Sequence, residues 1–299
     1  MKITEFTYSL GKVEKGYNNR TLYINLTNNQ IKSKPVTQFM KDTFIGGRGF
    51  NLWLLWNALP KDRKVKWDDS ENTMCIACGP LGGTPMYPGS GKSIVVAISP
   101  LTDSIIDSNV GGYFGPYLKF AGWDALEMQG KAKSEVIIFI DGDKGKVVIE
   151  DGEGFPSETH LLTEILTEKY GGENKRSVSV VSAGSGAEHT RFGCLNFSWY
   201  DSSRKVVRYK QAGRGGTGTV LRNKKVRAIV AKFSNLTGRI NNPADFDLLR
   251  QVGTAYSKEI RMLDPKQHGM AVVGTTHLVD IMNDFDLLPT ENFKFGSHQ

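Results

Sequence analysis

The sequence predicts an α+β fold, in which a duplicated β-sheet domain with glycine-loop and short-helix units is followed by the start of an α-helical domain. Three observations predict it: a strand-rich first part, a repeated glycine-rich segment, and helical patterns from Asn242 onward. The strand runs are β-branched or alternating and are bounded by turn-forming residues. They are RTLYINLT (20–27), SIVVAIS (93–99), EVIIFIDG (135–142), KVVIED (146–151), RSVSVVSAG (176–184) and VRAIVAKF (226–233).

Two helices interrupt these strands. The run GFNLWLLWNALP follows a turn of three glycines and one arginine, Gly46–Gly49, and stops at Pro60. The run SETHLLTEILTEKYGG begins at a capping Ser157 and ends at Gly171. Both runs therefore have a helix start signal and a stop signal, and their length is ordinary for a helix of a globular protein.

The sequence pattern changes from strand-like to helical near residue 238. Asn242 is the predicted N-cap of a long helix with Pro243 at its first position, and TTHLVDIMNDFDLLP (275–289) follows as a second helix. We therefore predict an α+β domain over 1–238 and the beginning of a helical domain, incomplete in this sequence, over 239–299.

Composition limits the location and the partners. The chain has 299 residues, a net charge of +7 and a pI near 9.1. It contains neither a signal-peptide pattern nor a run of about 20 apolar residues, so we expect a cytoplasmic protein without a membrane span. The positive charge is compatible with an anionic ligand, an acidic partner or nucleic acid, and does not choose among them.

The turn PGSGKS (88–93) resembles part of a nucleotide-binding loop. That loop needs a glycine five positions before its Gly-Lys pair and a helix directly after it, because backbone N–H groups and a helix N-terminus hold the phosphates. Here the position is Met86, and the strand-like IVVAIS follows. The sequence therefore argues against ATP, and Lys92 needs another explanation.

A repeat lies in the glycine-rich segments. GYFGPYLKFAGWDALEM from Gly112 aligns with GGTGTVLRNKKVRAIVA from Gly215 at a constant shift of 103 residues, although glycine-rich segments can also match by chance. The matched pairs are Gly112/Gly215, Gly115/Gly218, Leu118/Leu221, Lys119/Arg222, Ala125/Ala228 and Leu126/Ile229. Each copy would place a glycine loop before a short helix, which suits an anion. Two such loops suit a ligand with two phosphates, or two phosphate-bearing ligands.

Cysteine and histidine do not suggest a separate site. Cys75 and Cys78 form one C-x-x-C without a second, and we expect all three cysteines, Cys194 included, to pack as small apolar residues. The histidines show no zinc-like spacing, and we expect structural or surface roles for them. They are His160, His189, His268, His277 and His298.

Several motifs together resemble a known family. FIGGRGFNLWLL, CGPLGGTPMYPGSGKS, SPLT, NVGGYFG, LKFAGWDA and AGRGGTG are similar to the N-terminal, cofactor-binding domain of the tungsten-containing aldehyde:ferredoxin oxidoreductases, from about residue 20 to 235. The resemblance implies a pterin-binding base that holds tungsten, or rarely molybdenum, through the dithiolenes of two pyranopterins. Their phosphates would share a magnesium ion. This is the twofold anionic ligand that the repeat suggests.

The resemblance also implies the site residues. Asn109 and Gln211 match positions whose main-chain carbonyls hold the magnesium. Lys92 and Lys210, one in each copy, stand where the family commonly has arginines that reach the two pterins. A lysine keeps the positive charge of an arginine but lacks the planar, forked pair of N–H donors that a guanidinium offers. The loops that would lie against pterin and phosphate contain Gly111, Gly112, Ala212, Gly213, Arg214 and Gly215.

Other parts of the family pattern are missing. The Cys-x2-Cys-x3-Cys group for a 4Fe-4S cluster does not occur in the sequence. We therefore expect a fragment or split product whose partner carries the cluster, or a retained domain without turnover. The complete enzyme would interconvert aldehydes and carboxylic acids with a ferredoxin-like electron acceptor.

Two alternatives belong to other classes. One is a non-catalytic pterin-binding or scaffold subunit of a redox complex. The other is a nucleic-acid-binding protein, because nine basic residues and no acidic one lie between Arg204 and Arg227. That run lacks interleaved aromatic residues beyond Tyr209, so a solvated or pterin-facing basic surface is the favoured interpretation.

Overall fold

The computed structural model describes residues 1–237, 239–267 and 269–297. Two of the histidines assigned to structural roles, His268 and His298, lie outside these residues, as does position 238. The chain divides into two compact units: Met1–Pro85 with Gly89–Phe246, and Met86–Pro88 with Asp247–Gln299. The functional division predicted at 238/239 stays a prediction.

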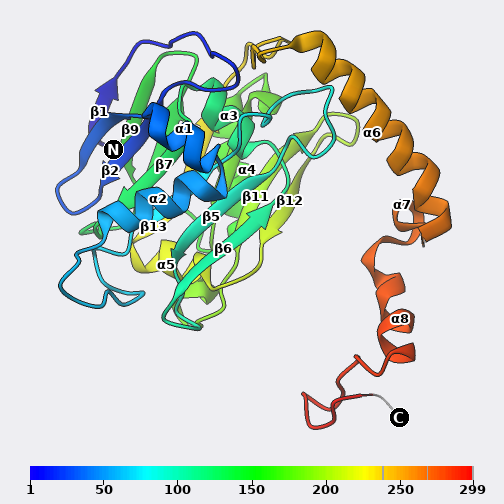
Figure 1. Cartoon of the computed structure of the whole chain (residues 1–299). Helices are drawn as coiled ribbons and strands as arrows, with labels where there is room; N and C mark the ends of the chain where they lie inside the picture. The colour runs from blue at the N-terminus through cyan, green and yellow to red at the C-terminus, as the bar shows by residue number, and fades with distance from the viewer. Residues whose placement is uncertain (238, 268, 298–299) are drawn as a thin grey trace. The chain divides into compact units, whose positions relative to one another are not determined.

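The first unit contains two mixed sheets and is shown with its helices in Figure 1. The seven-stranded sheet has the order β1 (Lys2–Thr7), β9 (Lys146–Asp151), β8 (Val136–Asp141), β13 (Val226–Lys232), β10 (Val178–Ser182), β11 (Leu195–Asp201), β12 (Val206–Ala212). The six-stranded sheet has the order β3 (Gln30–Pro35), β2 (Arg20–Asn25), β7 (Ala125–Gln129), β4 (Met74–Ala77), β5 (Ser93–Ile98), β6 (Ile105–Val110). The α+β class and the six predicted strands are confirmed.

The same topology occurs twice. The series β3-β2-β7-β4-β5-β6 corresponds to β9-β8-β13-β10-β11-β12, and in each series only the second and third strands are parallel. Each half therefore starts with a hairpin, continues through a helix, and returns as a meander. The similarity extends well beyond the glycine-rich segments in which the sequence repeat was found.

The helices of the first unit occupy three layers. The helices are α1 (Gln38–Phe44), α2 (Arg48–Ala58), α3 (Phe114–Phe120), α4 (Thr159–Gly171) and α5 (Thr217–Asn223), with the short 3-10 helices η1 (Lys175–Ser177) and η2 (Ser185–Glu188). Helices α1 and α2 share a core with the six-stranded sheet, and α4 with the seven-stranded sheet. The largest core joins both sheets with α3 and α5. The two short helices that follow the glycine loops are therefore buried centrally.

The predicted helix boundaries need two corrections. The N-cap of α4 is Glu158 rather than Ser157, because its carboxylate accepts from the N–H groups of His160 and Leu161. Asn242 is not an N-cap: its φ is +40°, outside the extended region that an N-cap adopts. Its side chain instead donates to the carbonyl oxygen of Val13 at 2.9 Å.

The second unit is helical in the residues that the structure describes. Its elements are α6 (Phe246–Gln267), α7 (Met270–Val273), η3 (Gly274–His277) and α8 (Leu278–Asp284). The predicted second helix therefore begins as a 3-10 turn and continues as α8. Among the described helices, none is long and apolar enough to cross a membrane.

Lys224 is buried directly after α5, with 1% of its surface exposed. Its Nζ donates to the carbonyl oxygen of Gly130 at 3.0 Å. Burial lowers the pKa of this ammonium group to about 7. The unfolded chain, where the ordinary value is near 10.5, therefore binds this proton more tightly than the folded chain.

Stability should consequently rise with pH between about 7 and 9.5. In this window the unfolded state holds more protons, and one proton changes the free energy of unfolding by at most about 1.4 kcal/mol per pH unit. Lys224→Met should flatten this rise, and Lys133→Met, which removes an exposed lysine, should leave it unchanged. Urea titrations at several pH values measure the slopes. Equal slopes for wild type and Lys224→Met would contradict the burial argument.

Candidate functional site

The two halves meet where their edge strands β6 and β12 lie beside each other. The loop after β12 packs on β6: the N–H of Arg214 donates to Ser108 Oγ at 3.1 Å. A Cβ atom added to Gly215 would lie 2.3 Å from Ile106 Cγ1, so no side chain fits there. The second glycine loop therefore belongs structurally to the edge of the first half.

The first glycine loop makes the reciprocal approach. A Cβ on Gly112 would meet only the ring of Trp199 on β11, at 4.0 Å, and a Cβ on Gly111 would meet nothing within 4 Å. Both residues follow β6 directly. The two predicted loops are thus brought to one junction, each close to the other half.

A cavity of about 680 Å³ opens at this junction. Gly112 from the first half and Lys210 from the second half both line it, together with the turn Gly89–Gly91. The rest of its wall is mainly apolar and includes Pro116, Tyr117, Phe120, Trp199, Leu236 and Ile240. An apolar cavity with a few polar groups and backbone at its rim is the usual form of a small-molecule site.

The PGSGKS turn packs against the first glycine loop. A Cβ on Gly91 would lie 2.5 Å from the carbonyl oxygen of Gly112, so the two backbones touch. The next residue, Lys92, is exposed, and its Nζ donates to Asn109 Oδ1 at 3.2 Å. The amine of this lysine therefore reaches the exposed face of β6, directly beside one of the two predicted magnesium ligands.

Lys92 and Lys210 do not occupy equivalent positions in the two halves. Lys92 precedes β5, whereas Lys210 lies within β12, where the shift of 103 residues makes Asp107 its counterpart. Each half thus contributes one lysine, but at a different place in its topology. Their charges reach the junction from different strands.

The remaining predicted residues differ in what they can offer a ligand. The side chain of Gln211 is directed to Asn196: Gln211 Nε2 donates to Asn196 Oδ1 at 3.1 Å. Ala212 is fully buried in the central core, so only its backbone can face a ligand. Gly213 has open space, with nothing within 4 Å of an added Cβ, and Arg214 is exposed. The glycines therefore divide into open ones (Gly111, Gly112 and Gly213) and a packed one (Gly215).

Lys119 supports this site and was not predicted. It lies on α3 and is buried, and its Nζ donates to the carbonyl oxygens of Gly79, Pro80 and Gly82 at 2.7–3.0 Å. It also donates to Asn241 Oδ1 at 3.2 Å. Burial lowers the pKa of Lys119. The signal in the sequence is a lysine in the apolar run YLKFAG, at the position that the repeat pairs with Arg222.

Asn241 belongs to the same hydrogen-bond network as Lys119. It is 2% exposed and donates from Nδ2 to the carbonyl oxygen of Pro80 and to Thr84 Oγ1. Its neighbour Ile240 lines the cavity, as do Gly83 and Pro85 beside the loop 79–82 to which Lys119 donates. Lys119 and Asn241 therefore fix two parts of the cavity wall without lining it themselves.

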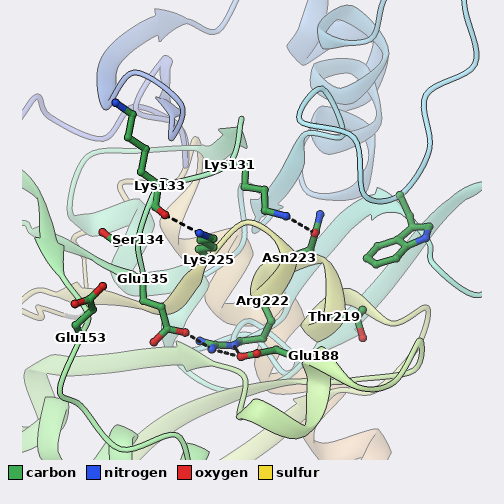
Figure 2. Close-up of a pocket in the computed structure, with 11 residues that line it drawn as sticks. Lys131, Lys133, Ser134, Glu135, Glu153, Glu188, Thr219, Arg222, Asn223 and Lys225 are labelled. Carbon is green, nitrogen blue, oxygen red and sulfur yellow. Dashed lines mark hydrogen bonds and ion pairs between the residues drawn. The ribbon is translucent and has the colours of Figure 1, made fainter.

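A second cavity, of about 420 Å³, lies beside α5 and is lined by none of the predicted site residues (Figure 2). The Arg222 guanidinium there pairs with both Glu135 and Glu188 (Figure 2). The amines of Lys131 and Lys225 donate to Asn223 Oδ1 and to the carbonyl oxygen of Lys133.

These contacts bear on the basic run 204–227. Arg222 and Lys224 are buried, and Arg227 pairs with Glu135. At the other end of the run, Arg204 pairs with Asp201 at 2.9 Å. The nine basic residues therefore do not present one continuous surface for a phosphate backbone.

Cysteine and histidine behave mostly as predicted. Cys75 and Cys78 are buried, and burial raises the pKa of both thiols, whereas Cys194 is only half-buried. His160 and His189 are exposed. Within the described part of the chain, no three His, Cys, Asp or Glu side chains gather as metal ligands would.

The fold and the paired glycine loops define the N-terminal domain of an aldehyde ferredoxin oxidoreductase, and that family model matches residues 21–233. The chain belongs to this family. It is 32% identical over 282 residues to the tungsten-containing aldehyde ferredoxin oxidoreductase of Pyrococcus horikoshii, covering 94% of this chain and 43% of the relative. The aliphatic sulfonate oxidoreductase WOR-like subunit of Pyrococcus furiosus is 32% identical over 230 residues, covering 73% of this chain and 35% of that relative.

A solved structure shows the same fold. The match is a chain of the active site complex BamBC of benzoyl coenzyme A reductase with 1,5-dienoyl-CoA, with a TM-score of 0.63 and 26% identity over 74% of this chain and 31% of that one. The chain thus spans less than half the length of the relatives it matches.

The open and packed glycines should differ in stability tests. Gly215→Ala forces a Cβ into Ile106 at a φ of +74°, which should cost about 2–4 kcal/mol of unfolding free energy. Gly111→Ala, with open space and an ordinary φ, should stay within about 0.5 kcal/mol of the wild type. Chemical denaturation measures both. A Gly215→Ala variant as stable as Gly111→Ala would show that the junction is not packed as described.

Proposed function

We propose that this chain is the cofactor-binding part of a tungstopterin oxidoreductase, and that the junction of β6 and β12 holds a tungsten or molybdenum bis-pyranopterin. The observation that carries the proposal is the open space at Gly111, Gly112 and Gly213, beside the exposed amines of Lys92 and Lys210. A Cβ at the first and third positions would fill only space that a ligand can use. The residues present therefore fit such a group.

The chain's residues would bind and orient this group. The glycines let backbone approach the phosphates, and Lys92 and Lys210 supply charge to the pterins. The apolar wall with Tyr117, Phe120 and Trp199 would keep water from one side of the ligand. When bound, the group supplies the metal centre for oxidation and reduction, while the protein sets its orientation and electrostatics.

Magnesium would be held mainly by oxygen atoms of the ligand. This ion prefers six oxygen ligands and commonly takes only a few from the protein when phosphates are present. The main-chain carbonyls of Asn109 and Gln211, on the two edge strands, are the proposed protein contribution. Such a site needs no cluster of carboxylates.

The lysines should make this site differ from one with arginines. An ammonium group offers a point charge and rotatable donors, whereas a guanidinium offers a planar fork for two parallel hydrogen bonds. Lys92 already shares its amine with Asn109. We therefore expect fewer hydrogen bonds to the pterin at these two positions, and a changed redox potential.

The proposed reaction is the interconversion of an aldehyde and a carboxylic acid, with electrons passed through a 4Fe-4S cluster to a ferredoxin-like acceptor. The name of the Pyrococcus horikoshii relative supports an aldehyde substrate and a ferredoxin acceptor, and the name of the WOR-like subunit supports an oxidoreductase. A C-terminal portion or a partner subunit would supply the cluster and the substrate pocket. A second candidate is a pterin-binding scaffold without turnover.

Alanine at the open glycines should separate ligand binding from folding. Gly111→Ala and Gly213→Ala should lower pterin and metal content to a small fraction of the wild-type value, because the new methyl group occupies ligand space. Gly11→Ala, equally open but outside the junction, is the matched control. The full chain is purified anaerobically with its complementary portion, and pterin fluorescence and elemental analysis give the contents.

Three results of this experiment are informative. Wild-type content in both junction variants would contradict the proposed site. Neither tungsten nor molybdenum in an assembled, folded complex would remove the tungstopterin proposal. A loaded complex that does not oxidise any aldehyde with a dye acceptor would favour the scaffold.

A further inference from the structure

The turn Gly46–Gly49 contributes no residue to the site proposed above. Gly46 and Gly47 have φ values of +157° and +52°. A Cβ on Gly46 would lie 3.1 Å from Pro80 Cδ and 3.3 Å from Gly79 Cα. This turn therefore lies against the loop whose carbonyl oxygens accept from Lys119. Arg48, the first residue of α2, is therefore presented from a closely fixed backbone.

The side chain of Arg48 reaches β6. Its NH2 group pairs with Asp107 Oδ2 at 2.8 Å. Asp107 and Asn109 are two residues apart on the strand, so their side chains leave the same face about 7 Å apart. Lys92 contacts Asn109 on that face. Two cations from different elements thus converge on the strand that carries a predicted magnesium ligand.

This ion pair leaves much of Arg48 available. The side chain is 57% exposed and that of Asp107 is 33% exposed. Pairs with such exposure contribute little to stability, so the pair alone does not explain why the arginine is held there. A guanidinium has five N–H donors, and one carboxylate oxygen leaves most of them for a second anion.

We propose that Arg48 is a phosphate-binding residue at the junction, aimed by Asp107 and acting with Lys92. The proposal rests on the proposed function, since the phosphate would be that of the pterin beside Asn109. A planar guanidinium suits phosphate better than an ammonium does. It would supply the fork that Lys92 and Lys210 lack. The Asp107 carboxylate faces the same ligand, and the magnesium ion would offset its repulsion.

The free chain can test this with magnesium pyrophosphate as the probe. Calorimetric titration should show binding that Arg48→Met weakens by about tenfold, the usual size of one charged hydrogen-bonding contact. Arg48→Lys should lie between wild type and Arg48→Met, since charge remains and the fork is lost. All variants should unfold at the wild-type temperature, because an exposed pair is removed.

Arg204→Met is the matched control. It removes one exposed arginine with a similar 2.9 Å ion pair to an aspartate, in the turn between β11 and β12. It should bind the probe like the wild type. Equal losses for Arg48→Met and Arg204→Met would reduce the effect to net charge and overturn the inference. Binding that Arg48→Met leaves unchanged, or a wild-type chain that does not bind the probe, would overturn it too.

The pterin content separates this inference from the function on which it rests. If the loaded complex holds pterin and Arg48→Met retains all of it, Arg48 is not a phosphate ligand and the cofactor site stands. If the wild-type complex holds no pterin while probe binding depends on Arg48, the anion site stands and the cofactor proposal fails.

Discussion

The close packing of Gly215 on Ile106 is the constraint on which the rest of the structure depends. It allows the loop after β12 to lie on β6, and it places the Arg214 N–H on Ser108 Oγ. The outer strands of the two sheets are thereby joined at the loop after β12, while much of both strands stays exposed to solvent. Every residue proposed to contact the cofactor lies on these strands or next to them.

Repetition of one topology explains why the junction has two glycine loops, but it does not make the junction symmetric. Each half supplies an edge strand, a loop and a buried short helix in the same order. The charges have diverged: Lys210 has Asp107 as its counterpart, and Asp107 holds Arg48. A pseudo-twofold frame can thus present different donors to two chemically similar ligands.

Six of the strands and the outer helices α2 and α4 could be predicted from the sequence, since their burial imposes a local pattern. The runs VIIFID and SIVVAI are buried almost throughout, and their β-branched content shows it. The edge strands β6 and β12 were missed because IIDSNV and VVRYKQA carry polar residues toward solvent. Which glycines face open space could not be predicted, because Gly213 and Gly215 differ only through contacts with a strand about one hundred residues away.

The positive charge of the chain is divided between two tasks. Lys119, Lys224 and Arg222 are buried, and carbonyl oxygens or carboxylates satisfy their donors, so they brace loops and cannot attract a ligand. Burial makes such groups costly unless those partners are in place. Lys92, Lys210 and Arg48 are exposed at one junction and keep donors to spare. The spare donors at the junction are therefore a better guide to an anionic ligand than the net charge of +7.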